Sequence, residues 1–210
     1  WDFNLKTNFQ LDKKNSISFL GLWATDNIEF GLRSADDKNA NPFENAKVDR
    51  NFYTAGFNHT YLIKNGYMRN VLSAVVTDGS TKQNNEANTI ETYKNNSVES
   101  EISLNSSISK NLSGKISIDG GIGGKLVKSD NDIYSEQDTS NTGYIIPETK
   151  NNIVINSFKL SGYLNVTSKL FNEKLLLNTG IRYDYFDYIT NPGSVSPRAG
   201  ISYKLTPVTS

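Results

Sequence analysis

The chain alternates between very short and long connections, which join segments in which every second residue is apolar. The tight connections are 12–15, 64–66, 110–114 and 170–174, and the long polar ones are about 33–49, 80–91, 130–151 and 190–196. A soluble sandwich has no reason to sort its connections in this way. A transmembrane β-barrel has short turns at one rim and long loops at the other. The pattern therefore predicts a barrel that crosses a membrane with strands.

Period-2 alternation defines the strands, most clearly over 97–109. One face of that segment carries Val98, Ile102, Leu104 and Ile108, and the other face carries only Ser, Asn and Glu. We expect about nine strands: 2–12, 15–32, 49–64, 67–80, 92–110, 114–129, 152–169, 174–189 and 197–206. Their polar faces do not suit a dry core and predict a wet lumen. We expect the faces with Val98, Ile118, Leu160 and Ile201 to point to lipid.

The composition fits this architecture and excludes others. Hydrophobic residues make up 36% of the chain, and the mean hydropathy is -0.51. No segment approaches the ~18–20 continuous apolar residues of a membrane helix, whereas a barrel wall needs only every second residue apolar. A net charge of zero without a basic run argues against nucleic acid as a partner. The absence of cysteine excludes disulfides and thiolate metal sites.

The predicted fold class is all-β: an antiparallel, up-and-down transmembrane β-barrel fragment with about nine meandering strands. We expect residues 1–210 to form part of one β-barrel domain. Bacterial single-chain barrels have even strand numbers, and closure removes sheet edges. The remaining strands are therefore expected outside this chain, and the fragment is expected to form an open, curved sheet.

Two runs near the end of the chain carry a family resemblance. Gly180-Ile181-Arg182-Tyr183-Asp184 fits a "G-x-R-Y-D" pattern, and the run from Ser196 to Lys204 fits "S-P-R-x-G-x-x-Y-K". In this order, with a loop between them, they resemble the barrel of TonB-dependent outer-membrane receptors. About 30 residues carry the recognisable motif, although the whole chain resembles such barrels in style.

The resemblance implies a barrel of ~22 strands with an N-terminal plug and a motif that binds the TonB energy-coupling protein. The plug and that motif are expected outside this chain. The implied function is active uptake of a scarce, bulky nutrient, such as a ferric siderophore, across the outer membrane of a Gram-negative bacterium. The implied partners are outer-membrane lipid, the nutrient and TonB. A passive porin, or a structural or adhesin barrel, remains an alternative.

The candidate ligand-binding residues have lumen parity near the outer strand ends: Arg50, Arg182, Asp184, Tyr188 and Arg198. Arginine offers a planar fork for anionic oxygens, so these positions suit an anionic or ferric-chelate ligand. The alternative is that Arg182, Asp184 and Arg198 pair with one another across neighbouring strands and only neutralise the lumen. The long outer loops are expected to contribute recognition, because loops on a rigid scaffold tolerate variation.

Other chemistry-bearing residues have simpler interpretations. His59 is the only histidine and lies on an apolar face, so neither a metal site nor a catalytic triad is predicted. The acidic stretch 130–138 lacks the EF-hand spacing and is expected to be a solvated loop. Tyr183, Tyr185, Phe186 and Tyr188 suit a membrane-boundary girdle, or alternatively a ligand-stacking patch. We expect no enzyme activity, metal or cofactor.

Overall fold

In the computed structural model, which describes residues 1–31, 45–85, 90–140 and 142–205, one nine-stranded sheet dominates the chain. Its strands follow one another as neighbours in sequence order, apart from a small two-stranded insertion. The nine are β1 (Asp2–Gln10), β2 (Asn15–Phe30), β3 (Ala46–Ile63), β4 (Gly66–Asn84), β5 (Glu91–Asn111), β6 (Ile116–Ser135), β9 (Thr149–Leu170), β10 (Leu175–Phe186) and β11 (Gly193–Tyr203). The insertion pairs β7 (Asp138–Thr139) with β8 (Ile145–Ile146).

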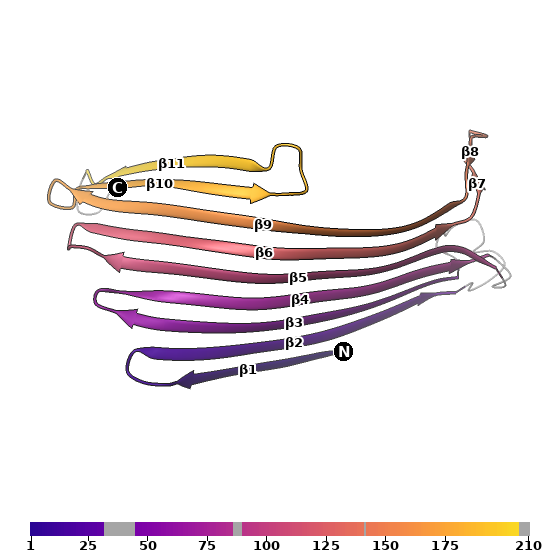
Figure 1. Cartoon of the computed structure of the whole chain (residues 1–210), viewed down its shortest axis with the longest axis horizontal. Helices are drawn as coiled ribbons and strands as arrows, with labels where there is room; N and C mark the ends of the chain where they lie inside the picture. Colours follow the sequence, from indigo (N-terminus) through magenta and orange to yellow (C-terminus); the bar gives the residue numbers. More distant parts are fainter. Residues whose placement is uncertain (32–44, 86–89, 141, 206–210) are drawn as a thin grey trace.

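Every neighbouring pair in the main sheet is antiparallel, so the predicted up-and-down meander is confirmed. Figure 1 shows an open, curved sheet with the four tight turns at one end. The opposite ends of β3, β4, β5, β6 and β9 reach well beyond the β10–β11 hairpin, and β7–β8 stands at their far tip (Figure 1). Among the described residues, none forms a helix long and apolar enough to cross a membrane.

Local chemistry explains the tight turns. Asn65 adopts a φ of 61° just before Gly66, as expected for an Asn-Gly hairpin. A Cβ on Gly66 would come within 2.9 Å of the Lys110 Cα atom, so only glycine fits beside the next strand. In the first turn the Asp12 carboxylate accepts hydrogen bonds from the backbone N–H groups of Lys14 (2.7 Å) and Asn15 (2.8 Å). These bonds lower the pKa of the Asp12 carboxyl.

The register places the apolar residues that define the predicted alternation of β5, β6 and β9 on one face, as predicted. Ile102 lies opposite Leu126, and Leu126 lies opposite Phe158 on the next strand. Val98, Ile118, Leu160 and Ile201 share this face. Side chains on it stay exposed: Leu126 is 64% exposed and Ile122 72%. A solvent-exposed apolar surface of this extent is unusual for a soluble protein, so we call it the lipid face.

The opposite face carries most of the polar side chains of the strands. The three buried side chains of the described residues, Ala46, Ser103 and Ser157, all have lumen parity. The Ser103 hydroxyl hydrogen-bonds the Ser73 hydroxyl at 2.7 Å across β4 and β5. We call this polar surface the lumen face.

The predicted strand ends were wrong at the long-loop side. Strand β6 continues to Ser135 and β9 begins at Thr149, so most of 130–135 is not the solvated loop expected from its acidity. Likewise β4 continues to Asn84, and β11 begins at Gly193. Over residues 81–84 of β4 and 130–132 of β6 both faces of the sheet are polar, so the sequence alternation that marks a strand disappears there. The predicted loop 33–49 lies mostly outside the described residues.

Candidate ligand site on the lumen face

A hollow of about 250 Å³ lies on the lumen side where the β10–β11 hairpin ends against β6 and β9. Strand β6 contributes Lys125, β9 contributes Lys159 and Ser161, and β10 contributes Arg182 and Asp184. Residues of the hairpin loop, including Ile189 and Asn191, also line it. The hollow therefore gathers three cations at the step between the short hairpin and the longer strands.

Two of these cations are direct neighbours across strands. Lys125 on β6 lies opposite Lys159 on β9. Like charges placed opposite each other in a sheet are destabilising. The Lys125 ammonium is partly compensated by Glu101, at 2.8 Å. The Lys159 ammonium instead lies 4.5 Å from the centre of the Phe186 ring, which leaves it without a carboxylate partner among the described residues.

Arg182 and Asp184 form a two-pronged ion pair along one strand. The Arg182 Nε and Nη2 atoms donate to the two Asp184 carboxylate oxygens at 2.6 and 2.7 Å. Both side chains are about 40% exposed, so solvent screens the pair. The Asp184 carboxylate offsets one of the three cations, so the hollow retains an excess of positive charge with Glu101 and Asp184 both counted.

Glycine makes room for the hollow. Gly123 on β6 lies between Asn105 of β5 and Ser161 of β9. A Cβ at this position would stand 3.1 Å from the Ser161 Oγ atom and would collide with the Asn105 amide oxygen. On the lipid face, the neighbouring Gly124 would place a Cβ at an ordinary 3.5 Å from the nearest Leu160 atom. Close approach therefore requires glycine at Gly123, the position that faces the lumen.

The structure brings together part of the predicted ligand set. Arg182 and Asp184 share the hollow, and Arg198 lies one step away on β11, opposite Gly180. Tyr188 is 60% exposed beyond the end of β10, where its ring lies 6.2 Å from that of Phe186. Arg50 is on β3, opposite Asp26 and Gly79, several strands away. The predicted ligand residues therefore do not form one site. Four of them lie around the β10–β11 hairpin, whereas Arg50 lies on β3.

Sequence reasoning missed Lys125 and Lys159 as site residues. Their lumen parity is readable from the alternation, but their juxtaposition depends on a register between segments more than 30 residues apart. The alternative expectation, an ion pair between Arg182, Asp184 and Arg198 across neighbouring strands, is met only in part. Arg182 pairs with Asp184 on its own strand rather than across strands.

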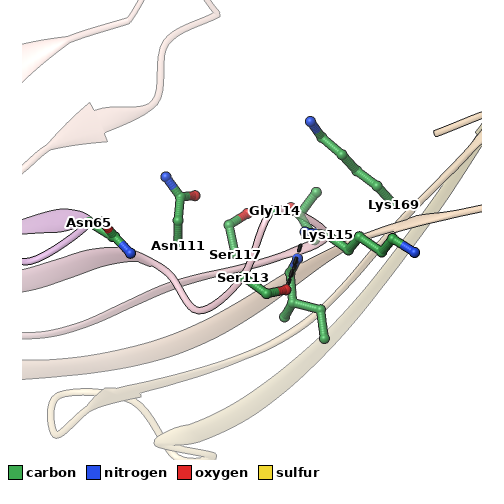
Figure 2. A pocket seen from close by; sticks show the side chains of 9 residues that line it. Asn65, Asn111, Ser113, Gly114, Lys115, Ser117 and Lys169 are labelled. Atoms are coloured by element: carbon green, nitrogen blue, oxygen red, sulfur yellow. Dashed lines mark hydrogen bonds between the residues drawn. The ribbon is translucent and has the colours of Figure 1, made fainter. Parts of the chain in front are cut away.

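A second hollow, of about 370 Å³, lies at the tight-turn rim. Figure 2 shows Asn111, Ser117 and Lys169 projecting from the same side of the sheet there. The Ser113 hydroxyl accepts hydrogen bonds from the backbone N–H groups of Lys115 and Ile116, both at 3.2 Å, and holds the turn. This rim also carries two neighbouring lysines, because the Lys169 backbone N–H donates to the Lys115 carbonyl at 2.8 Å. The Lys169 ammonium lies 3.7 Å from the Glu173 carboxylate, and none of the described residues that line this hollow is an arginine.

No metal centre or triad forms within the ranges that the structure describes. No cluster of three or more metal-ligating side chains occurs there. His59 lies on the lipid face opposite Ile17 and Asn70, and its Nε2 atom is 3.0 Å from the Asn15 Oδ1 atom. The imidazole is accounted for by this hydrogen bond.

Comparison with known proteins places the chain in a family. The family model "TonB dependent receptor-like, beta-barrel" matches residues 1–210. No curated protein matches the chain.

Solved structures agree with this fold at low sequence identity. The ferric enterobactin receptor PfeA of Pseudomonas aeruginosa superposes with a TM-score of 0.69 and 16% identity, over 98% of this chain and 31% of that one. The outer membrane transporter YddB of Escherichia coli superposes with a TM-score of 0.66 and 11% identity, over 95% of this chain and 29% of that one. The siderophore receptor PiuA of Acinetobacter baumannii superposes with a TM-score of 0.58 and 11% identity, over 98% of this chain and 40% of that one. The chain thus spans about a third of these structures.

The lipid face, the polar lumen and the sorted connections are those of a barrel wall in the outer membrane of a Gram-negative bacterium. The match over the full sequence completes the assignment. The chain belongs to the TonB-dependent receptor β-barrel family.

Proposed function

We propose that this chain forms part of the wall of an active-uptake receptor for a scarce, bulky, anionic nutrient, and that Lys125, Lys159 and Arg182 bind its negative groups. A ferric siderophore is the best candidate. The observation that carries the proposal is the directly opposed pair of Lys125 and Lys159 beside Arg182 on the lumen face.

The charge arrangement supports an anionic ligand. An opposed lysine pair is unfavourable in the empty sheet, and a bound carboxylate or catecholate oxygen would relieve it. Lysine supplies three donors and arginine a planar fork, and both bind anionic oxygens well. The Phe186 ring next to Lys159 adds a surface on which an aromatic ligand group can stack.

The location of the hollow also favours uptake. It lies at the loop end of the short β10–β11 hairpin, and the long strands continue beyond this end (Figure 1), so a ligand that enters along the far strand ends would reach it. Arg198 lies within reach of a ligand held by Arg182. Arg50 and Tyr188 lie outside the hollow, and we propose that they contact larger ligands, together with the outer loops.

The whole receptor would need parts outside this chain. We infer that a plug and further strands complete the barrel, and that TonB supplies energy through the region before Trp1. The wall alone would also serve a passive porin or an adhesin. PfeA is a ferric enterobactin receptor and PiuA is a siderophore receptor, and the fold that they share with this chain makes the siderophore class the first to test.

The test is an uptake and binding assay with the full-length receptor in an outer membrane that lacks other such receptors. A panel of radiolabelled ferric catecholate, hydroxamate and citrate complexes serves as the probe. The variants are Lys125→Gln with Lys159→Gln, and the control is Lys128→Gln. Lys128 lies three residues from Lys125 on the same strand but on the lipid-face side.

We expect one anionic complex to be taken up by the wild type and the Lys128 variant. The double variant should bind it at least about a hundredfold more weakly, because it loses two charge-assisted bonds that are worth about 1.5–3 kcal/mol each. Equal binding by both variants would overturn the assigned residues. Uptake that continues after the membrane is de-energised would overturn active transport and favour the porin.

A further inference from the structure

The tight-turn rim concentrates positive charge. Two carboxylates, Asp12 and Glu173, lie in or next to the four tight connections. Eight exposed lysines lie in the same stretches and at the end of β11, and we call them the lysine row: Lys13, Lys14, Lys64, Lys110, Lys115, Lys169, Lys174 and Lys204. Because the whole chain has a net charge of zero, the excess here is balanced by negative charge elsewhere. The charge is therefore sorted toward the end of the sheet that carries the tight turns (Figure 1).

The two carboxylates leave most of this charge uncompensated. The Asp12 carboxylate accepts hydrogen bonds from the backbone N–H groups of Lys14 and Asn15 within its own turn. The Glu173 carboxylate lies 3.7 Å from the Lys169 ammonium. Among the described residues, Lys169 is the only member of the lysine row that forms an ion pair. The other members are therefore available to an anion from outside the chain.

Lysines of the row are also direct neighbours. The Lys169 backbone N–H donates to the Lys115 carbonyl, and the Lys204 N–H donates to the Lys174 carbonyl, both at 2.8 Å. Like charges side by side in a sheet repel each other. In Figure 2 the Lys115 and Lys169 side chains extend in different directions, so their ammonium groups offer two separate contact points. The arrangement therefore favours an anion that carries several charges along its length.

The hollow of about 370 Å³ at this rim, which we call the rim hollow, adds groups that suit a peptide. Besides Lys115 and Lys169, its lining includes the amide of Asn111 and the hydroxyls of Ser117 and Thr167. Amides and hydroxyls both donate and accept hydrogen bonds, as a peptide backbone requires. Ammonium groups form charge-assisted hydrogen bonds with carboxylates. The rim hollow therefore suits an acidic peptide.

The lysine row is long and lies on the periplasmic side. Neighbouring tight turns are two strands apart, so at ~4.8 Å per strand they are spaced about 10 Å apart and span about 30 Å. The short turns of outer-membrane barrels face the periplasm. Lys115 and Lys169 each precede an apolar residue of lipid-face parity, Ile116 and Leu170. Both lysines therefore have lumen parity and are set inside the rim, away from the surrounding lipid.

We propose that the rim hollow and the lysine row bind the acidic stem peptides of the cell-wall polymer that lies beneath the outer membrane. These peptides carry carboxylates and are repeated along a polymer, so they match both the rim hollow and the length of the row. Anionic phospholipids fit less well, because a headgroup would not reach lysines set inside the rim. A second copy of this chain also fits less well, since its own lysines would meet them. The inference does not depend on the ligand proposed for the lumen.

The experiment measures co-sedimentation of the purified full-length receptor, in mild detergent, with cell-wall sacculi that have been stripped of protein. Lys115→Gln with Lys169→Gln removes both lysines of the rim hollow. The matched control, Lys82→Gln with Lys128→Gln, removes the same charge from the far parts of β4 and β6. Sacculi with amidated carboxylates are the chemical control. Resistance of the folded barrel to unfolding in SDS checks assembly.

We expect the rim variant to bind sacculi about three- to tenfold more weakly than the wild type, as for the loss of two partly exposed charge contacts. The far-end control should bind like the wild type. Binding should weaken as salt is added, because exposed charges are screened, and amidated sacculi should not bind. Equal binding by the rim variant and the wild type would overturn the proposal, as would equal binding of amidated and untreated sacculi.

Glu173→Gln tests the same site with the opposite sign. It removes the carboxylate beside Lys169, so it should tighten binding to sacculi about two- to threefold, a gain that a misfolded variant cannot produce. Weaker binding would contradict the site. If the wild type bound vesicles of anionic phospholipid but not sacculi, the partner would be the membrane and the proposal would fail. Binding to neither would show that carboxylates elsewhere in the receptor already pair with these lysines, and would also overturn it.

Discussion

The outward side of strand β5 changes its chemistry along its length while the backbone stays the same. Toward the tight turns it presents Ile102, Leu104 and Ile108, and toward the far end it presents Asn96 and Lys94. The hydrogen-bonded ladder to β4 and β6 runs continuously through both regions. The backbone hydrogen bonds between strands therefore define the sheet along its whole length. The side chains on the outward face differ between the part of β5 near the tight turns and the part near its far end.

The largest effect should come from placing a charge at the lipid level. We expect Leu104→Lys to destabilise the assembled barrel by roughly 2–4 kcal/mol, because an ammonium at the membrane midplane loses its hydration. Asn105→Lys, on the adjacent exposed lumen position, and Asn152→Lys, outward but far above, should cost little. The measurement is the free energy of unfolding of the full-length receptor in lipid bilayers.

Ser103, which also has lumen parity on β5, is unsuitable as a control position. Ser103 is only 5% exposed and hydrogen-bonds Ser73, so a lysine there would be crowded for reasons unrelated to the membrane. If Leu104→Lys and Asn152→Lys cost the same, the division of the outward surface into two levels is wrong.

The next effect concerns the two faces of β6. Gly123→Leu should fill the lumen hollow and weaken ligand binding by about tenfold, with about 1–3 kcal/mol lost from folding stability through overpacking. Gly124→Leu should leave binding unchanged, because its Cβ meets only ordinary contacts on the lipid face. Ligand titration of both variants is the measurement. Weaker binding in both would mean that the strand was distorted, not that the hollow was filled.

A smaller effect is expected from the Arg182–Asp184 pair. Both partners are partly exposed, so Asp184→Asn should cost about 1 kcal/mol or less in stability. Arg182→Gln, alone and with Arg198→Gln, should reduce uptake while the barrel assembles normally. Poor assembly with proportionate loss of uptake would favour a purely structural ion pair, and unchanged uptake would remove both arginines from the ligand site.

The smallest effect should occur in the first tight turn, at the wet rim. Backbone hydrogen bonds from Lys14, and then bonds from Asn15, lower the pKa of the Asp12 carboxyl in the folded chain. Because the pKa is lowered in the folded chain, the ionised carboxylate contributes its full stabilisation of the turn at pH values above the ordinary carboxyl pKa. This stabilisation is lost as the pH falls through the lower pKa of the folded chain. Asp12→Asn should therefore make turn stability less dependent on acid pH, measured by hydrogen exchange of the turn amides between pH 2 and 6, about the ordinary carboxyl range. An unchanged pH profile would contradict the role of Asp12.

The sequence predicts the membrane-level part of this structure well. Alternation at Ile102 and Leu104 and the Asn65-Gly66 turn each carry a local signal, and the structure confirms the strands, the faces and the tight turns from them. The far strand ends lack such a signal. At Asp130, Asn131 and Asp132 both faces meet water, so a paired strand and a polar loop have the same composition.

Only part of the candidate site can be predicted from the sequence, because the rest depends on how distant strands pair. The motif that contains Arg182 and Asp184 marks one strand, and it indicates two residues of the hollow. The opposed pair of Lys125 and Lys159 appears only when the register of β6 against β9 is known, because the pairing joins residues on either side of the β7–β8 insertion. Gly123 is likewise readable as a flexible residue, but its role as a space between Asn105 and Ser161 depends on both neighbouring strands.

The most direct measurement is a cryo-electron microscopy structure of the full-length receptor with its transported ferric complex bound. The proposed function predicts that anionic oxygens of the complex lie within hydrogen-bond distance, about 2.7–3.2 Å, of the Lys125, Lys159 and Arg182 nitrogens. A complex held only by the outer loops would contradict the lumen assignment. The same contradiction would follow if carboxylates from another part of the receptor already paired with Lys125 and Lys159 while the ligand was bound elsewhere.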